Sequence, residues 1–381
     1  MDKRQFSKHE WQDTGARVEI SDFEPDGGVS EYHAIIHIEP RGEIFTDQYA
    51  RLLRAEEALL SLPQLSGASV VFKRYFLSDA CNQVPLMTDL GDSSVSFIQQ
   101  PPLDGSKVAL WVYLQKGVEL RCEDGVIVVD HNGYRQLWKM GMTSNLGDSA
   151  TQTRTLLEQY EAMLARYGAT IEANSIRTWF YVRDVDTQYA GMVRARKENF
   201  EANGLTPHTH YISSTGIGGL PADPKAIIQL GTFSLLGFKP EQQRYLYALS
   251  HLNKTIEYGV TFERGTLMEY GDRGHIFISG TASIDNKGNV LYVGDIRRQT
   301  MRMWENVEKL LEEGGMTMDD IMQIVVYLRD TADYDIVSHM FAERFPATPY
   351  VLTLAPVCRP SWLIEMECIA VDGRRTRFVN F

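Results

Sequence analysis

The clearest pattern of hydrophobic and polar positions lies between residues 275 and 371. An apolar run interrupted by glycine, HIFISGTASID, opens this stretch, and apolar residues recur at helical spacing over 295–315 and 331–345. β-Rich runs lie at 322–330, 346–354 and 362–371. The periods predict the order strand, helix, strand, helix, strand, strand. Such a set can cover one face of a sheet with two helices and stand as a domain.

The first two thirds of the chain carry looser versions of this order. In the first third the pattern predicts a helix at 44–62 and strands at 32–39, 69–77, 94–100 and 107–115. In the second it predicts helices at 151–167 and 187–203 and strands at 126–130, 134–140, 175–182, 208–213 and 226–233. Residues 1–30 are interpreted as a polar lead-in with one strand at 16–20. Residues 115–148 are interpreted as a connector of short hairpins, and residues 235–273 as a second, Tyr-rich connector.

Three predicted strands end in similar sequences, which suggests an internal repeat. They are FLSD at 76–79, YVRD at 181–184 and YLRD at 327–330, and each follows a predicted amphipathic helix. Such strand ends are common, so coincidence is the alternative, but the flanking elements also recur in order. We therefore expect an α+β protein built from three units, at 1–115, 116–235 and 236–381.

Composition and charge exclude several classes of protein. The 381 residues carry a net charge of −12, which disfavours binding to nucleic acid. No apolar run approaches the ~20 residues of a membrane helix, and the N-terminus has no apolar signal core. The four cysteines form no CxxC pair. We expect a reduced, cytoplasmic protein with free thiols rather than a disulfide scaffold or a zinc site.

The third unit resembles the RidA/YjgF superfamily, also called endoribonuclease L-PSP-like. The resemblance is carried by 276-IFISGTASID, 299-QTMRMWENVEKLLEEGG, 317-TMDDIMQIVVYLRD, 345-FPAT and 364-IEMECIAV. It implies α/β units of the bacterial chorismate-mutase-like kind, with helices outside mixed sheets and a ligand cleft at each subunit interface of a trimer. Three units in one chain then imply a monomeric internal pseudo-trimer whose clefts lie between units.

A narrower resemblance is to the chorismatases, which hydrolyse the enolpyruvyl ether of chorismate and release pyruvate without a cofactor. It is carried by 177-RTWFYVRDVD, 214-STGIGG, Tyr258-Gly259, 279-SGTAS and the spacing of Cys358 and Glu365. The Tyr-Gly-Pro-Arg stretch of that family is YGVTFERG here, so a substrate-binding arginine is missing or displaced.

Glu365 is the first candidate for a catalytic residue. Alternation along WLIEMECIAV puts Glu365 and Glu367 on one face of a strand. Burial on a partly apolar strand raises the pKa of a carboxyl, which then keeps the proton that an enol-ether carbon must receive. Spacing alone favours a solvated edge glutamate. The resemblance to the first glutamate of IEME favours the acid, with Glu367 as the substitute.

A cyclic dicarboxylate also needs cationic or hydroxyl partners, for which we select Arg177, Arg196, Thr215, Tyr258 and Arg264. Arg196 belongs to a run of basic residues on its predicted helix, and a solvated basic face is the favoured alternative. Arg177 opens an aromatic strand, where stacking on an aromatic ring is an equal alternative.

Several small residues and one thiol complete the candidate site. Gly216, in STGIGG, could offer backbone N–H groups to an anion, although the motif lacks the ending of a P-loop and a plain turn explains it as well. Ala282, in SGTAS, could line a pocket where a ligand ring approaches the backbone. In chorismatases a residue at the position of Cys358 affects which product forms; a buried inert thiol is the favoured alternative. His208 and His210 could begin a metal site, but no third ligand is evident, so we expect none.

The leading hypothesis is a chorismatase-like hydrolase that acts on a small carboxylate by protonation from Glu365. One alternative is a RidA-type enamine/imine deaminase. Those enzymes bind the substrate carboxylate with an arginine two residues after a proline, a position that Thr348 and Thr209 occupy here and that has no counterpart in the first unit. The other alternative is a non-catalytic protein that binds small metabolites.

Overall fold

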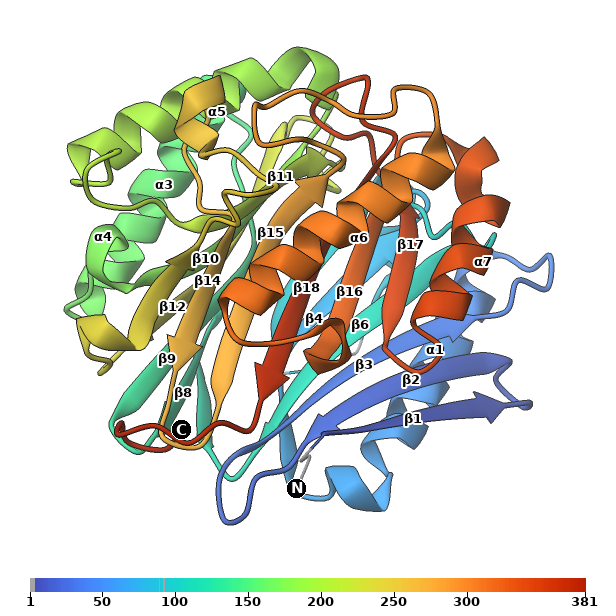
Figure 1. Ribbon diagram of the computed structural model, residues 1–381. Coiled ribbons are helices and arrows are strands. Elements are labelled where there is room, and N and C mark those ends of the chain that lie inside the picture. Colours follow the sequence, from blue (N-terminus) through green and yellow to red (C-terminus); the bar gives the residue numbers. More distant parts are fainter. Residues whose placement is uncertain (1–3, 89, 92) are drawn as a thin grey trace.

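A computed structural model describes residues 4–88, 90–91 and 93–381. These residues form three six-stranded sheets with helices on their outer sides (Figure 1). No helix in this described part of the chain is long and apolar enough to cross a membrane.

The three sheets share one strand order. The first runs β1-β2-β3-β6-β4-β5, the second β7-β8-β9-β12-β10-β11 and the third β13-β14-β15-β18-β16-β17. Neighbouring strands are antiparallel except for the pairs β4–β5, β10–β11 and β16–β17, which are parallel. Even a bulge recurs in the same strand of each unit, at Val71, Ile176 and Met322. The predicted α+β fold with three repeated units is therefore confirmed.

The strands have the following bounds. The first sheet comprises β1 (Arg4–Trp11), β2 (Ala16–Phe23), β3 (Ser30–Ile38), β4 (Ala68–Leu77), β5 (Ser94–Gln99) and β6 (Val108–Lys116). The second comprises β7 (Glu119–Glu123), β8 (Val126–His131), β9 (Tyr134–Thr143), β10 (Ser175–Val182), β11 (Ser213–Gly218) and β12 (Ile228–Leu236). The third comprises β13 (Gln243–Leu246), β14 (Gly265–Glu269), β15 (Gly274–Ala282), β16 (Ile321–Leu328), β17 (Tyr350–Leu354) and β18 (Ile364–Asp372).

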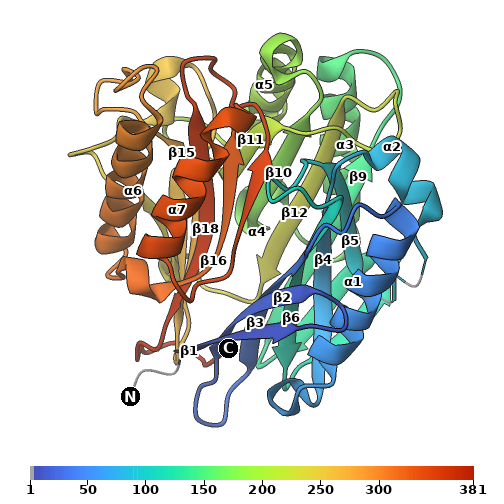
Figure 2. The same cartoon turned by 90° about the vertical axis from the view of Figure 1, so that its right-hand side faces the viewer.

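Each sheet packs one face against helices of its own unit (Figure 2). These helices are α1 (Phe45–Leu60) and the short α2 (Ala80–Gln83) in the first unit; α3 (Ser149–Arg166), α4 (Ile171–Asn174) and α5 (Val185–Ala202) in the second; and α6 (Ile296–Glu313) and α7 (Tyr334–Arg344) in the third. Glu56, which interrupts the apolar stripe of α1, is buried in an ion pair with Lys73.

The opposite faces of the sheets meet in a common core around a pseudo-threefold axis. Aromatic rings run through it from unit to unit. Phe72 of the first unit lies 5.3 Å from Trp138 of the second, Trp138 stacks on Phe233 at 4.1 Å, and Phe233 lies 5.3 Å from Phe277 of the third. Large aromatic side chains bury much apolar area, so this core holds the three units together.

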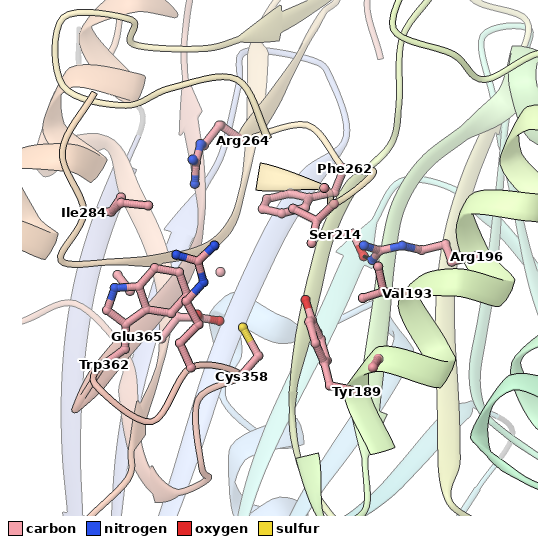
Figure 3. A pocket seen from close by; sticks show the side chains of 17 residues that line it. Tyr189, Val193, Arg196, Ser214, Phe262, Arg264, Ile284, Cys358, Trp362 and Glu365 are labelled. Atoms are coloured by element: carbon pink, nitrogen blue, oxygen red, sulfur yellow. Dashed lines mark hydrogen bonds between the residues drawn. The ribbon is translucent and has the colours of Figure 1, made fainter. Parts of the chain in front are cut away.

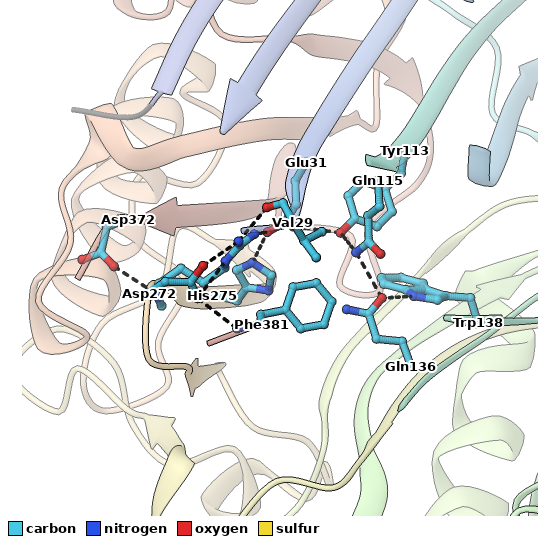
Figure 4. Close-up of polar contacts among 12 residues, drawn as sticks. Val29, Glu31, Tyr113, Gln115, Gln136, Trp138, Asp272, His275, Asp372 and Phe381 are labelled. Atoms are coloured by element: carbon cyan, nitrogen blue, oxygen red, sulfur yellow. Dashed lines mark hydrogen bonds and ion pairs between the residues drawn. The ribbon is translucent and has the colours of Figure 1, made fainter. Parts of the chain in front are cut away.

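A polar network closes one end of this core (Figure 4). Glu31 of β3 is buried in an ion pair with Arg273 and accepts a hydrogen bond from His275 Nε2 at 2.7 Å. Tyr113 donates to Glu31 at 2.8 Å and Gln115 Nε2 to Tyr113 Oη at 2.6 Å. Gln115 Nε2 also donates to Gln136 of the second unit at 3.1 Å, so the network joins all three units.

The interpretation of two stretches as connectors between units is wrong, although the strands predicted at 126–130 and 134–140 in the first stretch are confirmed as β8 and β9. Residues 115–148 contain β7, β8 and β9, and residues 235–273 contain β13 and β14, so each stretch begins a sheet. The polar lead-in likewise contains β1 and the whole of β2. The reason is exposure: the edge strands β1 and β7 alternate between exposed and half-buried residues, without the apolar face that marks a strand in sequence.

The strand predicted at 208–213 is also wrong. The strand is β11, which covers most of STGIGG, a stretch that we interpreted as a turn. This strand has small residues because the third unit packs directly against it: Gly218 N donates to Pro356 O at 2.9 Å, and a Cβ on Gly218 would lie 2.7 Å from that oxygen. His208 and His210 therefore share no strand, and the described residues contain no group of three metal ligands.

Candidate active site

A cavity of about 270 Å³ lies between the second and third units (Figure 3). Helix α5 and strand β11 form its wall on the second unit. Residues 259–264 and 358–362 and the ends of β15 and β18 form its wall on the third. The cavity is thus assembled from segments far apart in sequence.

Glu365 of β18 contributes a carboxyl to this cavity and is only 5% exposed. Burial, reinforced by the negative charge of Glu367, raises the pKa of Glu365 to about 8, against the opposing effects of Arg177 and Arg264. Among the residues that the structure describes, none donates a hydrogen bond to this carboxyl. Desolvation therefore outweighs the nearby cations, and the group is mostly protonated at neutral pH.

Gly280 of β15 makes room for this carboxyl. A Cβ added to Gly280 would lie 2.1 Å from Glu365 Oε1, a distance that no real contact allows. Ala282, which pairs with Glu365 across β15 and β18, is also buried in the cavity wall. The small residues of SGTAS thus let the carboxyl lie against the backbone of β15.

Arg196 lies buried in the wall formed by α5, and its Nη1 donates to Ser214 Oγ at 3.4 Å. The expectation of a solvated basic face is therefore wrong for Arg196, although it holds for Arg194 and Lys197, which are exposed. The helix turns Arg196 toward Ser214 of β11 and the cavity. Gly216 of β11 also lines the cavity, and a Cβ there would lie 3.0 Å from the ring of Tyr189.

Arg264 lines the opposite wall and is 4% exposed. Its Nη2 donates to the backbone oxygen and to Oδ1 of Asn253, both at 3.1 Å, which fixes the guanidinium. The backbone of Tyr258 forms the end of a 3₁₀ turn at Thr255–Tyr258, but its side chain lies outside the described residues. Gly259 lines the cavity.

Arg177 and Thr215 lie behind the cavity wall rather than in it. Arg177 Nη2 donates to Thr215 Oγ1 at 2.6 Å and to Glu367 Oε2 at 2.8 Å. Its guanidinium also lies 5.0 Å from the centre of the Trp179 ring, as the stacking alternative proposed. Thr215 in turn accepts from Gly280 N at 2.9 Å. These contacts hold β11 of the second unit against β15 of the third.

Cys358 is half-buried in the cavity wall, near Tyr189 and Glu365 (Figure 3). Burial, and then the charge of Glu365, raises the pKa of this thiol to about 12. The thiol is therefore neutral at physiological pH and contributes shape and weak polarity instead of a nucleophile.

Sequence reasoning missed Tyr189, Arg359 and Trp362, which also line the cavity. The guanidinium of Arg359 lies 4.8 Å from the centre of the Trp362 ring. A signal for Tyr189 existed: it precedes Arg196 by two helical turns, so both residues lie on one face of α5. Arg359 and Trp362 lie between Cys358 and Glu365, where no periodicity marks them.

Among the residues that the structure describes, only the third unit has a carboxyl at this register position. Glu365 pairs with Tyr327 of YLRD, and the equivalent residues of YVRD and FLSD, Tyr181 and Phe76, pair with Gln229 and Ala109. Gln229 Nε2 donates to Ser96 Oγ at 2.8 Å across the first and second units. The repeat has thus diverged at the register position of Glu365.

Comparisons with known proteins show the family of this chain. The sequence model of the family described as Endoribonuclease L-PSP matches residues 269–372. A RutC family protein of Pyrococcus abyssi is 35% identical over 97 residues, which are 25% of this chain and 76% of that protein. A RutC family protein of Pyrococcus horikoshii is 34% identical over 97 residues, 25% of this chain and 77% of that protein. The chain therefore belongs to the RutC family, part of the RidA superfamily.

The arrangement of the three units is that of a chorismatase. The crystal structure of a chorismatase matches with a TM-score of 0.64 at 20% identity, and the match covers 81% of this chain and 96% of that one. The chain thus has a chorismatase-like fold within its superfamily.

Proposed function

We propose that this protein is a chorismatase-like hydrolase, which cleaves the enolpyruvyl ether of chorismate or a similar cyclic dicarboxylate and releases pyruvate. The observation that carries this proposal is the buried carboxyl of Glu365 in the cavity wall, with a pKa raised to about 8. A general acid is most effective when its pKa lies near the working pH.

In the proposed reaction Glu365 donates its proton to the methylene carbon of the enol ether. The resulting oxocarbenium ion lies beside the carboxylate that has just formed, which stabilises its positive charge. Water then adds to the oxocarbenium carbon, which bears the ether oxygen, and a proton from this water returns to Glu365. The hemiketal formed collapses into pyruvate and the ring alcohol, so the overall reaction consumes one water molecule and needs no cofactor.

The arginines of the cavity support a dicarboxylate substrate. Arg196 and Arg264 are buried in opposite walls, one from each unit, and Arg359 lines the same cavity. A guanidinium binds a carboxylate by two parallel hydrogen bonds. Arg264 also lies six residues after Tyr258, where the Tyr-Gly-Pro-Arg stretch of chorismatases is altered, so we assign the displaced arginine to Arg264.

The imine deaminase alternative lacks its carboxylate-binding arginine. Strand register makes Ile212 and Ser93, and not Thr209, the counterparts of Thr348 in the other two units. None of the three is an arginine. This disfavours ordinary imine hydrolysis, in which that guanidinium holds the substrate.

Pyruvate release from chorismate tests the proposal. We expect the wild-type protein to form pyruvate, followed through NADH consumption by lactate dehydrogenase, and Glu365→Gln to reduce the rate by at least about 10²-fold. Cys81→Ser, at an exposed position far from the cavity, is the matched control. Wild-type rates no higher than those of Glu365→Gln would refute the hydrolase. Saturable binding of chorismate without turnover would instead establish a binding protein.

A further inference from the structure

A buried triad of charges joins the three units directly behind the candidate acid. Glu367 accepts a hydrogen bond from Arg74 Nη1 of the first unit at 3.2 Å and from Arg177 Nη2 of the second at 2.8 Å. Trp179 Nε1 also donates to Glu367 Oε1 at 2.9 Å. The two guanidinium groups and the carboxylate are at most 3% exposed. Removing one partner from such a buried set leaves an uncompensated charge.

Arg177 of β10 lies near two carboxyls, which share one face of β18. Glu365 and Glu367 are separated by one residue, so both side chains leave the strand on one side. In the folded protein Arg177 bonds to Glu367, and its other contacts are the hydroxyls of Thr215 and Ser279, at 2.6 and 3.3 Å. Glu365 faces the cavity without such a bond. Arg177 is thus hydrogen-bonded to Glu367 and not to Glu365.

We propose that Glu367 is a positioning residue: it engages Arg177, which would otherwise pair with Glu365, and so leaves the carboxyl of the cavity free to keep its proton. This inference rests on the proposed function, since it explains how the acid stays in its active form. It also assigns Arg177 to the support of the acid instead of to substrate binding.

The charges around both carboxyls agree with this assignment. Glu365 is faced by Glu367 on its own strand, by Arg177 of β10, by Arg264 and by the neutral thiol of Cys358. After burial, Glu367 is the strongest influence that raises the pKa of Glu365, and Arg177 is the strongest that lowers it. Glu367 itself faces Arg74 of β4 and Arg177, with the neutral phenols of Tyr181 and Tyr327 nearby.

Two substitutions with opposite expected effects test the proposal. Glu367→Gln removes the negative charge and releases Arg177, so the pKa of Glu365 should fall by about one unit or more. Arg177→Gln removes the competing cation, so that pKa should rise by a similar amount. The direct measurement is the carbonyl stretch of the protonated carboxyl in difference infrared spectra, assigned by its loss in Glu365→Gln and followed against pH.

The pH profile provides a second measurement. The alkaline limb of kcat/KM should move to lower pH in Glu367→Gln and to higher pH in Arg177→Gln, while KM below pH 6 changes less than threefold. Glu31→Gln is the control, because Glu31 has an equally buried ion pair with Arg273 at the far end of the core. Glu31→Gln should lower the free energy of unfolding without shifting the alkaline limb of kcat/KM.

An unchanged infrared titration in both variants would overturn the proposal, and so would shifts in the same direction. If Glu367→Gln does not fold, the upward shift in Arg177→Gln still decides the matter. Absence of pyruvate from the wild-type protein would refute the proposed function alone, since the infrared titration needs no turnover.

Discussion

Replacing Glu365 by glutamine should make the protein inactive and, at neutral pH, more stable. The unfolded chain ionises this carboxyl with the ordinary pKa of 4.5, whereas the folded chain does so at about 8. Between these values the unfolded state has lost its proton and the folded state has not, so folding must take up a proton. The wild-type protein therefore loses stability as the pH rises from 4.5 to 8, and glutamine, which does not ionise, avoids this loss.

The two pKa values give the size of the effect. At pH 7 the unfolded carboxyl is 2.5 units above its pKa of 4.5, and the folded one is about one unit below its value of about 8. The difference costs the folded state about 3 kcal/mol at pH 7 and approaches about 5 kcal/mol above pH 8. Below pH 4 it vanishes, because both states are then protonated.

Urea unfolding of both proteins at pH 4, 5.5, 7 and 8.5 measures this difference. The free energy of unfolding of Glu365→Gln minus that of the wild type should grow by about 3 kcal/mol between pH 4 and pH 7. Any constant cost of burying the amide cancels in this comparison. A difference that stays constant with pH, or that shrinks as the pH rises, would refute a raised pKa for Glu365 in the folded protein.

Three further predictions concern the surroundings of the acid. Gly280→Ala places a Cβ 2.1 Å from Glu365 Oε1, so kcat for pyruvate release should fall about 10²-fold with little change in the melting temperature; an unchanged kcat would contradict the role of this glycine. Arg264→Met should raise KM for chorismate about 10–100-fold and change kcat less, and an effect on kcat alone would argue against carboxylate binding. Under native conditions a thiol reagent at pH 8 should modify the exposed Cys81 and Cys122 before Cys358, whose pKa is raised to about 12, as peptide mapping by mass spectrometry would show; early labelling of Cys358 would contradict a protonated thiol.

Most of the third unit could be predicted from sequence, because the elements between residues 275 and 371 carry a clear period. Strand β16 is buried along its whole length, and helix α6 buries apolar residues at helical spacing, among them Met303, Val307 and Leu310. The opening strands of the units could not be predicted from sequence, because edge strands such as β7 have no apolar face. Strand β11 was hidden for another reason: its small residues, typical of a turn, are required by the third unit packed against it. The unit boundaries at 115/116 and 235/236 stay predictions.

The candidate site was predictable where a strand pattern or the family resemblance contains the signal, as for Glu365, Arg264 and Cys358. The resemblance of IEME to the family sequence indicated Glu365 as the acid, and alternation along the strand indicated the face that it shares with Glu367. The burial of Arg196 was not predictable, because it depends on contacts of α5 with Ser214 and Phe180 of the sheet, whereas Arg194 and Lys197 of the same basic run are exposed. The ion pair between Arg177 and Glu367 joins residues 190 positions apart in sequence. No local sequence pattern indicates such a contact. Contacts between units thus define most of this site.

The divergence of Glu365, Gln229 and Ala109 at one register position has a consequence for how such proteins evolve. In an assembly of identical subunits, every substitution appears in all copies of the interface at once, so a change that improves one function must be tolerated everywhere. Joining the copies in one polypeptide removes that constraint. One interface between units can then specialise in chemistry, while the other interfaces only hold the units together. The cost is that three units must be synthesised for one functional site.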